Sequence, residues 1–187
     1  IASQNSREQY MQVRKALLPD VETIHDLILT YSQQRDGELI ERTVPELCEN
    51  VRDFFVVEDE SGVFGCGALH LYGTHLAEVR SICVRPGASG RGGGRLLLEA
   101  LIAEAEQHSV SCVCLFTRAP GFFGRFGFKQ VEREELPDKI YKDCVNCAKQ
   151  DACDEVPMYR GELPHFAILA PPEAELKILR ERIKPKR

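Results

Sequence analysis

The sequence predicts a single α+β domain with a central mixed, mostly antiparallel sheet flanked by helices. Three consecutive segments, 54–58, 63–72 and 77–84, carry the apolar and β-branched residues typical of strands. A glycine-rich turn and a leucine-rich segment at helical spacing follow them, and a buried strand is expected after that. A chain of 187 residues is long enough for one substantial core.

The first elements are a strand and two helices. Residues 13–17 read as a strand, and Asp20 offers an N-cap for an amphipathic helix. The apolar face of that helix is expected to contain Val21, Ile24, Leu27, Ile28 and Tyr31. Pro45 then begins a second, shorter helix.

The next elements form a meander. Segments 54–58 and 63–72 are expected to pair across the turn at 59–62, and the strand 77–84 follows. Because short turns join these segments, an antiparallel arrangement is predicted.

The remaining elements alternate helix and strand. The helix after the glycine-rich turn is expected to bury Leu97, Leu98, Leu101, Ile102 and Ala105 and to end near His108. A buried strand at 111–117, a short helix opened by Pro120 and an extended segment at 127–131 complete the predicted order.

The glycine-rich turn is the main functional signal. Four glycines leave backbone N–H groups free to converge on an anion at the positive end of the following helix: Gly90, Gly92, Gly93 and Gly94. Arg85, Arg91 and Arg95 add positive charge. A flexible loop is the alternative interpretation. The turn lacks the Gly-Lys-Ser/Thr of a P-loop, and the G-x-G-x-x-G dinucleotide pattern does not fit its place in the chain.

Two motifs resemble those of the Gcn5-related N-acetyltransferase (GNAT) family. Residues 89–94, SGRGGG, resemble its acyl-CoA-binding motif, although Ser89 replaces the usual Gln or Arg. Residues 122–128, FFGRFGF, resemble its second signature, an aromatic pair leading to Gly-Phe. The resemblance covers about residues 11–131 and implies the GNAT acyl-CoA N-acyltransferase fold with acetyl-CoA as cosubstrate.

The resemblance also implies which residues contact acetyl-CoA. In this family the strand before the turn binds the pantetheine arm through its backbone, and the turn binds the pyrophosphate. The positions expected to contact the cosubstrate are Ile82, Cys83, Val84, Gly90, Arg91, Gly92, Gly93, Gly94, Arg95 and Phe123. Phe123 stands where many relatives have a tyrosine that acts as general acid, so water, Tyr141 or no acid would serve here.

Glu78 is the candidate catalytic base. Strand periodicity places Glu78, Arg80, Ile82 and Val84 on one face of a regular strand. We expect Glu78 to take a proton from the incoming ammonium and Arg80 to bind a carboxylate of the acceptor. A backbone N–H in 82–84 is the expected oxyanion donor. The alternative is a surface ion pair of little energetic importance. His70 and His75 could join a proton relay, but a structural or exposed histidine is the favoured interpretation.

The acceptor is predicted from cations and from resemblance. A dicarboxylic amino acid needs groups such as Arg80, Arg118 and Lys139 to pair with its carboxylates. Segments 77–81, 115–118 and 136–158 resemble short bacterial N-acetylglutamate synthases, which implies acetylation of the α-amine of L-glutamate, the first step of arginine biosynthesis. Two alternatives stay open: a GNAT enzyme acting on another small amine or a protein amine, and a non-catalytic acyl-CoA-binding regulatory module.

The eight cysteines predict reduced thiols in a chain without a secretion signal. Five lie in or beside apolar segments and are expected in the core: Cys48, Cys66, Cys83, Cys112 and Cys114. Three others, Cys144, Cys147 and Cys153, have a spacing that can begin a zinc site, with His165 or Asp154 as a fourth ligand.

Charge and hydropathy restrict the partners. The net charge of −5 argues against general nucleic-acid binding, and no apolar run approaches a membrane span. We expect a cytoplasmic protein with a leader or expression remnant at 1–10, one domain at 11–170 and a basic tail at 171–187 that is either solvated or helical. The oligomeric state, a homodimer included, stays open.

Overall fold

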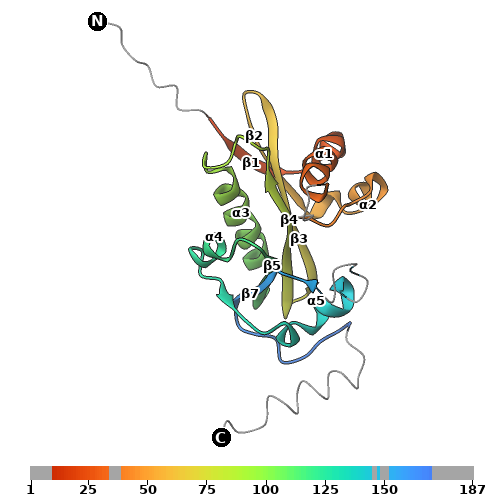
Figure 1. Cartoon of the computed structure of the whole chain (residues 1–187), viewed down its shortest axis with the longest axis vertical. Helices are drawn as coiled ribbons and strands as arrows, with labels where there is room; N and C mark the ends of the chain where they lie inside the picture. The colour runs from red at the N-terminus through yellow and green to blue at the C-terminus, as the bar shows by residue number, and fades with distance from the viewer. Residues whose placement is uncertain (1–9, 34–38, 145–146, 148–151, 170–187) are drawn as a thin grey trace, which may run out of the picture. The chain divides into compact units, whose positions relative to one another are not determined.

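The computed structural model describes residues 10–33, 39–144, 147 and 152–169 (Figure 1). The predicted leader therefore lies outside the described residues except for Tyr10, which is exposed. The predicted basic tail lies wholly outside them.

The described residues form five α-helices, three short 3₁₀ turns and seven strands, in an order that confirms the predicted α+β class. The strands are β1 (Gln12–Lys15), β2 (Phe54–Asp59), β3 (Gly62–Gly73), β4 (Leu76–Val84), β5 (Cys112–Thr117), β6 (Lys129–Gln130) and β7 (Val156–Gly161). The helices are α1 (Val21–Ser32), α2 (Val44–Glu49), α3 (Gly93–Gln107), α4 (Pro120–Gly124) and α5 (Pro137–Lys142). Helix α5 and strand β7 follow the last predicted segment, 127–131, and were not predicted from the sequence.

The sheet has the strand order β1-β2-β3-β4-β5-β7-β6. Strands β1 and β2 pair antiparallel, as do β2 and β3, which confirms the first part of the predicted meander. Strand β4 pairs in parallel with β5 at Ala77–Val113 and Glu78–Cys114. Strand β7 then lies between β5 and β6, antiparallel to both. The sheet is therefore mixed and mostly antiparallel.

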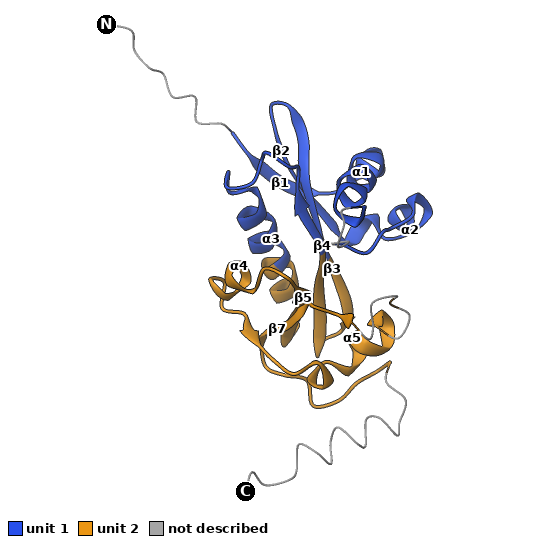
Figure 2. Cartoon of the chain, viewed as in Figure 1, with its two compact units in different colours: residues 1–68, 81–101 blue, residues 69–80, 102–187 orange. Residues whose placement is uncertain are grey.

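The chain divides into two compact units (Figure 2). Unit 1 comprises residues 1–68 and 81–101, and unit 2 comprises residues 69–80 and 102–187. Strands β3 and β4 and helix α3 each contribute residues to both units.

Unit 1 has helices on both faces of its strands. On one face, Ile24 and Ile28 of α1 pack with Val56, Cys66 and other buried residues of the strands. On the other face, Leu97 of α3 packs with Val57 and Phe64. Figure 2 shows α1 and α3 on opposite sides of the blue strands. The amphipathic pattern predicted for each helix is thus satisfied by burial of one face.

Unit 2 has a smaller core around β5. Leu76, Cys112, Cys114 and Leu136 form a buried cluster, with Tyr72 and other partly buried residues packed against it. Leu136 immediately precedes α5, so the cluster fixes the start of that helix against the sheet. This arrangement places α5 beside the strand segment that carries Glu78.

The predicted N-cap of α1 has a different function. Asp20 is the residue before α1, but its side chain makes no capping hydrogen bond. It accepts instead from the backbone N–H of Leu17 and from the guanidinium of Arg14 at 2.7 Å. Helix α2 has a complete capping box, in which Thr43 and Glu46 bond each other's backbone N–H groups.

Strand β4 departs from regular alternation at Ser81. Ser81 has a φ of 53°, in the left-handed region that non-glycine residues seldom adopt. Because a regular strand alternates only while its backbone stays extended, periodicity alone does not place Glu78 and Ile82 on one face, and their shared face stays a prediction. Ile82 packs with the α3-side cluster, whereas Cys83 belongs to the α1-side cluster.

The cysteine predictions are confirmed at four positions and wrong at one. Cys66, Cys83, Cys112 and Cys114 are buried, but Cys48 is exposed because it lies on the outer side of the short helix α2. Among the helices of the described residues, none combines the length and apolar character that crossing a bilayer would require.

Candidate active site

The glycine-rich turn of unit 1 leads directly into α3. Gly87, Gly90 and Gly92 have φ values of 86°, 82° and 95°, which a side chain would strain. Gly93 begins α3, and a Cβ there would lie 2.7 Å from a ring carbon of Phe64. Glycine is therefore required in the turn for its backbone conformation and at Gly93 for close packing. The helix N-terminus after this turn provides the N–H groups suited to a phosphate.

The arginines of the turn contact groups of unit 1. Arg91 donates to Asp59 at 2.6 Å, and its guanidinium lies 5.1 Å from the centroid of the Phe64 ring. Hydrogen bonds from Ser61 and Arg91 lower the pKa of Asp59 to about 2. Arg85 donates to the carbonyl of Val63. These contacts fix the turn against the β2–β3 hairpin.

The β4 segment expected to bind pantetheine is held from its α1 side. The Tyr31 hydroxyl donates to the carbonyl oxygen of Val84. The sulfur atoms of Cys66 and Cys83 lie 3.7 Å apart. A hydrogen bond between these two thiols, together with burial, raises the pKa of Cys66. The Cys66 thiol is therefore a neutral packing element near neutral pH.

Glu78 lies at the centre of a buried polar cluster in unit 2. Glu78 is only 3% exposed. One carboxylate oxygen, Oε1, lies 2.6 Å from Nζ of Lys139, and Oε2 accepts a hydrogen bond of 2.8 Å from the Tyr72 hydroxyl. A buried carboxylate held by one cation and one hydroxyl has a fixed orientation and a compensated charge.

Lys139 joins two carboxylates. Its Nζ also donates to Asp143 at 2.8 Å and lies 5.7 Å from the centroid of the Phe116 ring. Burial by itself lowers the pKa of Lys139, but the charges of Glu78 and Asp143 outweigh it and raise that pKa well above its usual range. Lys139 is therefore a buried ammonium at neutral pH. Burial and the charge of Glu78 likewise raise the pKa of Tyr72, so its hydroxyl stays protonated.

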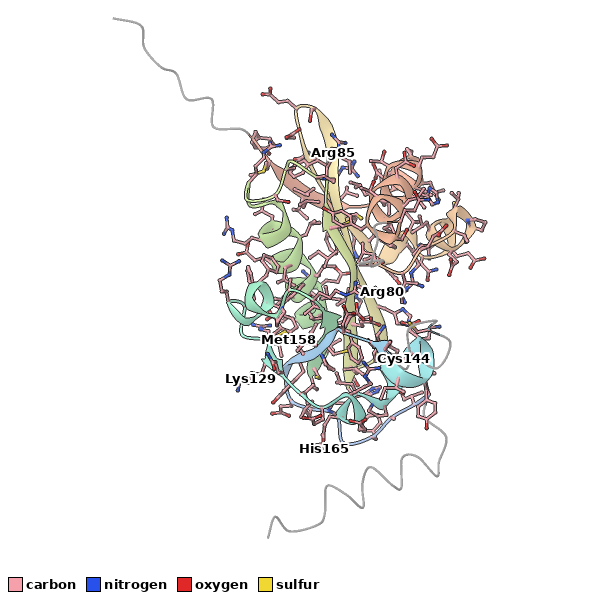
Figure 3. All side chains as sticks on the ribbon, in the orientation of Figure 1. Arg80, Arg85, Lys129, Cys144, Met158 and His165 are labelled. Atoms are coloured by element: carbon pink, nitrogen blue, oxygen red, sulfur yellow. The ribbon has the colours of Figure 1, made fainter. Side chains whose placement is uncertain are left out.

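A second ion pair lies in the same unit. Arg118 pairs with Asp154 at 2.7 Å, and the Asp154 side chain is 59% exposed. The neighbouring Glu155 is largely shielded, and burial raises the pKa of its carboxyl. Figure 3 shows Arg80 on β4 and Cys144 just after α5, both in unit 2. An exposed partner such as Asp154 can exchange for a carboxylate of a ligand.

The aromatic segment after β5 is packed within unit 2. Phe123 is 5% exposed, and its ring centroid lies 5.0 Å from that of Phe122 and 6.0 Å from that of Phe128. These rings fix α4 and the turn at Gly127, whose φ is 82°. The signature therefore has a packing function in addition to any contact with acetyl-CoA.

The three cysteines of the predicted zinc site differ in burial. Cys144 is buried, and Cys147 and Cys153 are partly buried. Within the ranges 10–33, 39–144 and 152–169 and at residue 147, no three His, Cys, Asp or Glu side chains gather as a metal ion requires. Residues 145–146 and 148–151 lie outside the described residues. Zinc binding by these cysteines therefore stays a prediction, which elemental analysis of the purified chain tests.

Two residues of the Glu78 cluster were not predicted from sequence. Tyr72 and Asp143 contact Glu78 and Lys139 respectively, but neither belongs to a motif. The separation of four residues between Lys139 and Asp143 was a usable signal, because it places both side chains on one face of a helix. The Tyr72 contact depends on how β3 and β4 pair, which the sequence does not specify.

Comparisons with known proteins agree with these motifs. The family described as "Acetyltransferase (GNAT) domain" matches residues 50–130. An uncharacterized N-acetyltransferase of Chlorobaculum tepidum, CT2212, is 39% identical over 148 residues, which cover 79% of this chain and 94% of that protein. An amino-acid acetyltransferase of Mycobacterium tuberculosis is 33% identical over 134 residues, which cover 70% of this chain and 75% of that protein.

A solved structure also shares the fold. The crystal structure of Rv2747 from Mycobacterium tuberculosis, in complex with CoA and NLQ, matches with a TM-score of 0.69 and 27% identity. The match covers 81% of this chain and 99% of that one.

Proposed function

Because this chain belongs to the GNAT acetyltransferase family and is an acetyl-CoA-dependent N-acetyltransferase, we propose that its acceptor is the α-amine of L-glutamate. The products are then N-acetyl-L-glutamate and CoA, and the reaction is the first step of arginine biosynthesis. The observation that carries the proposal is the buried ion pair between Lys139 of α5 and Glu78, which lies on the strand that leads to the glycine-rich turn. The amino-acid acetyltransferase name of a 33% identical relative supports an amino-acid acceptor.

The residues proposed for acetyl-CoA are those of β4 and the turn. Backbone groups of Ile82, Cys83 and Val84 bind the pantetheine arm. The N–H groups from Gly90 to Gly94 bind the pyrophosphate, with Arg91 and Arg95 supplying positive charge. Phe123 packs beside the cosubstrate. The conformation of the turn and the start of α3 at Gly93 support this assignment.

Glu78 is proposed as the base. Attack on the thioester needs a neutral amine, so Glu78 accepts the proton of the acceptor ammonium, directly or through one water. The amine nitrogen then bonds to the thioester carbon, and a backbone N–H in 82–84 stabilises the oxyanion. Collapse of this intermediate breaks the C–S bond and releases CoA thiolate, while the second proton of the amine nitrogen passes through water toward that thiolate. A thiol of pKa about 8.5 leaves without a dedicated acid, so Tyr141 or water suffices for its proton.

The acceptor carboxylates are proposed to pair with Arg80, Arg118 and Lys139. Arg118 supports this most directly, because its present partner Asp154 is exposed and can be displaced. Lys139 is already held between Glu78 and Asp143, and an acceptor carboxylate would share its third hydrogen. A dicarboxylate acceptor therefore complements the positive groups of this cluster.

An acceptor screen tests the proposal. The purified chain is incubated with acetyl-CoA and one amine at a time, and CoA thiol release is followed. The panel contains L-glutamate, L-glutamine, L-aspartate, L-lysine and peptides with free N-termini. We expect the highest kcat/KM with L-glutamate. Turnover confined to a peptide or another amine would overturn the acceptor assignment, and acetyl-CoA binding without any turnover would favour a regulatory module.

A further inference from the structure

A buried histidine–aspartate pair lies next to the Glu78–Lys139 pair in unit 2. Nε2 of His75 lies 2.6 Å from Oδ2 of Asp138, and the two side chains are only 4% and 1% exposed. His75 lies in the turn between β3 and β4 and stands three residues before Glu78. Asp138 lies on α5, immediately before Lys139. Two consecutive residues of α5 thus contact His75 in the β3–β4 turn and Glu78 on β4.

Asp138 accepts hydrogen bonds at both of its carboxylate oxygens. Its second oxygen, Oδ1, accepts from the backbone N–H groups of Ile168 at 2.8 Å and Leu169 at 2.6 Å. The carboxylate therefore holds three segments together: α5, the turn before β4 and the segment at 165–169. Helix α5 has six residues and no side-chain N-cap, so it depends on such outside contacts for its position.

The His75 ring donates a hydrogen bond to Asp138 through Nε2. A neutral ring must carry its hydrogen on Nε2, because an unprotonated Nε2 would direct a lone pair at the carboxylate. Nδ1 is buried and has no hydrogen-bond partner among the described residues. A Cβ at Gly73 would lie 2.9 Å from Nδ1, and the ring lies 4.5 Å from that of Phe166. The ring is thus packed between Gly73 and Phe166.

The Glu78–Lys139 contact depends on the position of α5. Lys139 bonds two carboxylates, and a shift of α5 would lengthen its 2.6 Å contact with Glu78. The backbone of Lys139 is linked directly to Asp138, which cannot move without losing three hydrogen bonds. The His75–Asp138 pair therefore restrains Lys139 more tightly than α5 alone could.

We propose that His75 and Asp138 are positioning residues, which act through Lys139 to hold the Glu78 carboxylate in the orientation needed for proton transfer. The proposal rests on the proposed role of Glu78 as base. Neither His75 nor Asp138 contacts the substrate in this account. A misplacement of about 1 Å at a reacting group can lower the rate by about 100-fold, so the effect on kcat is measurable.

A double-mutant cycle tests this role. His75→Phe keeps a ring against Phe166 but removes the donor to Asp138, whereas His75→Gln retains a donor. Each change is made in the native chain and in a Lys139→Met chain, and kcat is measured with whichever amine the native chain acetylates. In the native background we expect His75→Phe to lower kcat by about 10- to 100-fold and His75→Gln to retain most of it. In the Lys139→Met background we expect less than a twofold further loss.

The controls separate positioning from folding. Asp20→Asn weakens a partly buried ion pair with Arg14 in unit 1, and it should lower the melting temperature without changing kcat. If His75→Phe does not fold, Asp138→Asn takes its place, because the amide oxygen still accepts from Ile168 and Leu169. The proposal is wrong if His75→Phe lowers kcat equally in both backgrounds, or if it lowers only the melting temperature. A wild-type chain that acetylates another amine contradicts the glutamate assignment alone, since the cycle then runs with that amine.

Discussion

Glu78 has a separate partner for each of its carboxylate oxygens. Lys139 holds Oε1 and Tyr72 holds Oε2, which leaves each oxygen further lone-pair capacity for an incoming ammonium or a bridging water. Burial keeps competing water out of the cluster, and the two partners fix the side chain. The structure thus gives Glu78 the fixed geometry that a base requires, which the sequence alone could not show.

Replacement of Glu78 by Gln removes the base and nearly preserves the shape of the side chain. We expect kcat at neutral pH to fall by about 10²- to 10⁴-fold, because positioned general bases contribute factors of that size. The deficit should shrink at high pH, where more of the free amine is already deprotonated. A pH–rate profile from pH 6 to pH 10 measures this. Glu99→Gln on the exposed side of α3 is the matched control, and a pH profile that keeps its wild-type shape in Glu78→Gln would argue against the base.

Asp59 gives a pH-dependent prediction for unit 1. Hydrogen bonds from Ser61 and Arg91 lower its pKa to about 2, below the value near 3.9 of a free aspartate. A carboxyl whose pKa is lowered on folding stabilises the protein above its unfolded pKa, and this stabilisation is lost as pH falls toward the folded value. Wild type should therefore exceed Asp59→Asn in stability above about pH 4, and the gap should close between about pH 4 and pH 2. Urea unfolding across that range measures the gap.

The exposed Asp26 provides the control for this measurement. Its side chain is 82% exposed, so Asp26→Asn should leave the free energy of unfolding nearly unchanged at every pH. A gap between wild type and Asp59→Asn that stays constant down to pH 2 would contradict the role given to Asp59.

At the scale of elements, the start of α3 is fixed by close packing. A Cβ at Gly93 would lie 2.7 Å from Phe64 and 3.4 Å from Val57, so alanine forces the helix or the ring to move. Overpacking of this kind costs about 1–3 kcal/mol. We expect Gly93→Ala to lower stability by that amount and to weaken acetyl-CoA binding, because α3 presents its N-terminus to the pyrophosphate. Calorimetric titration with CoA, together with urea unfolding, measures both.

Gly121→Ala is the matched control for Gly93→Ala. A Cβ there would meet nothing within 4 Å, and its φ lies outside the left-handed region. Gly121→Ala should therefore leave CoA binding and stability unchanged. Equal CoA affinity in Gly93→Ala and wild type would contradict the placement of the pyrophosphate at this helix.

Most elements could be predicted from sequence, and the exceptions have physical causes. Strands β2 and β3 were predicted from β-branched and aromatic residues, and α1 and α3 from helical spacing. Strand β7 was missed because Pro157 interrupts it and a polar, cysteine-containing stretch precedes it. Proline is tolerated there because the short β6 pairs only with Met158 and Tyr159. The backbone change at Ser81 gave no signal, since serine fits a regular strand equally well.

The candidate site was predicted in part. Glu78 and Lys139 were singled out by position and charge, but their direct contact depends on where α5 lies, and α5 was not predicted. Asp138 and His75 gave no signal as a pair, because 63 residues separate them. Long-range contacts of this kind follow from tertiary packing rather than from local pattern.

At the scale of the whole molecule, the residues proposed to bind acetyl-CoA and those proposed to bind the acceptor belong mostly to different units. The residues proposed for acetyl-CoA belong to unit 1 except Phe123, and those proposed for the acceptor belong to unit 2. We therefore expect the two functions to separate kinetically. Arg80→Ala and Arg118→Ala should raise the KM for the acceptor by about tenfold or more, as expected for loss of a charged hydrogen bond, and leave the KM for acetyl-CoA within about twofold.

Lys129 on the exposed strand β6 provides the control cation. Lys129→Ala removes a positive charge of unit 2 that has no proposed contact with the acceptor, so both KM values should stay at wild-type levels. Equal rises in the two KM values of Arg80→Ala or Arg118→Ala would show that these arginines maintain the fold instead of binding the acceptor.

Identification of the reaction product tests the glutamate assignment. Wild-type chain, acetyl-CoA and L-glutamate are mixed at neutral pH, and the small-molecule products are analysed by mass spectrometry over time. We expect N-acetyl-L-glutamate and CoA in equal amounts, formed with multiple turnovers. Absence of N-acetyl-L-glutamate, from a chain that binds acetyl-CoA and acetylates a different amine, would contradict that assignment.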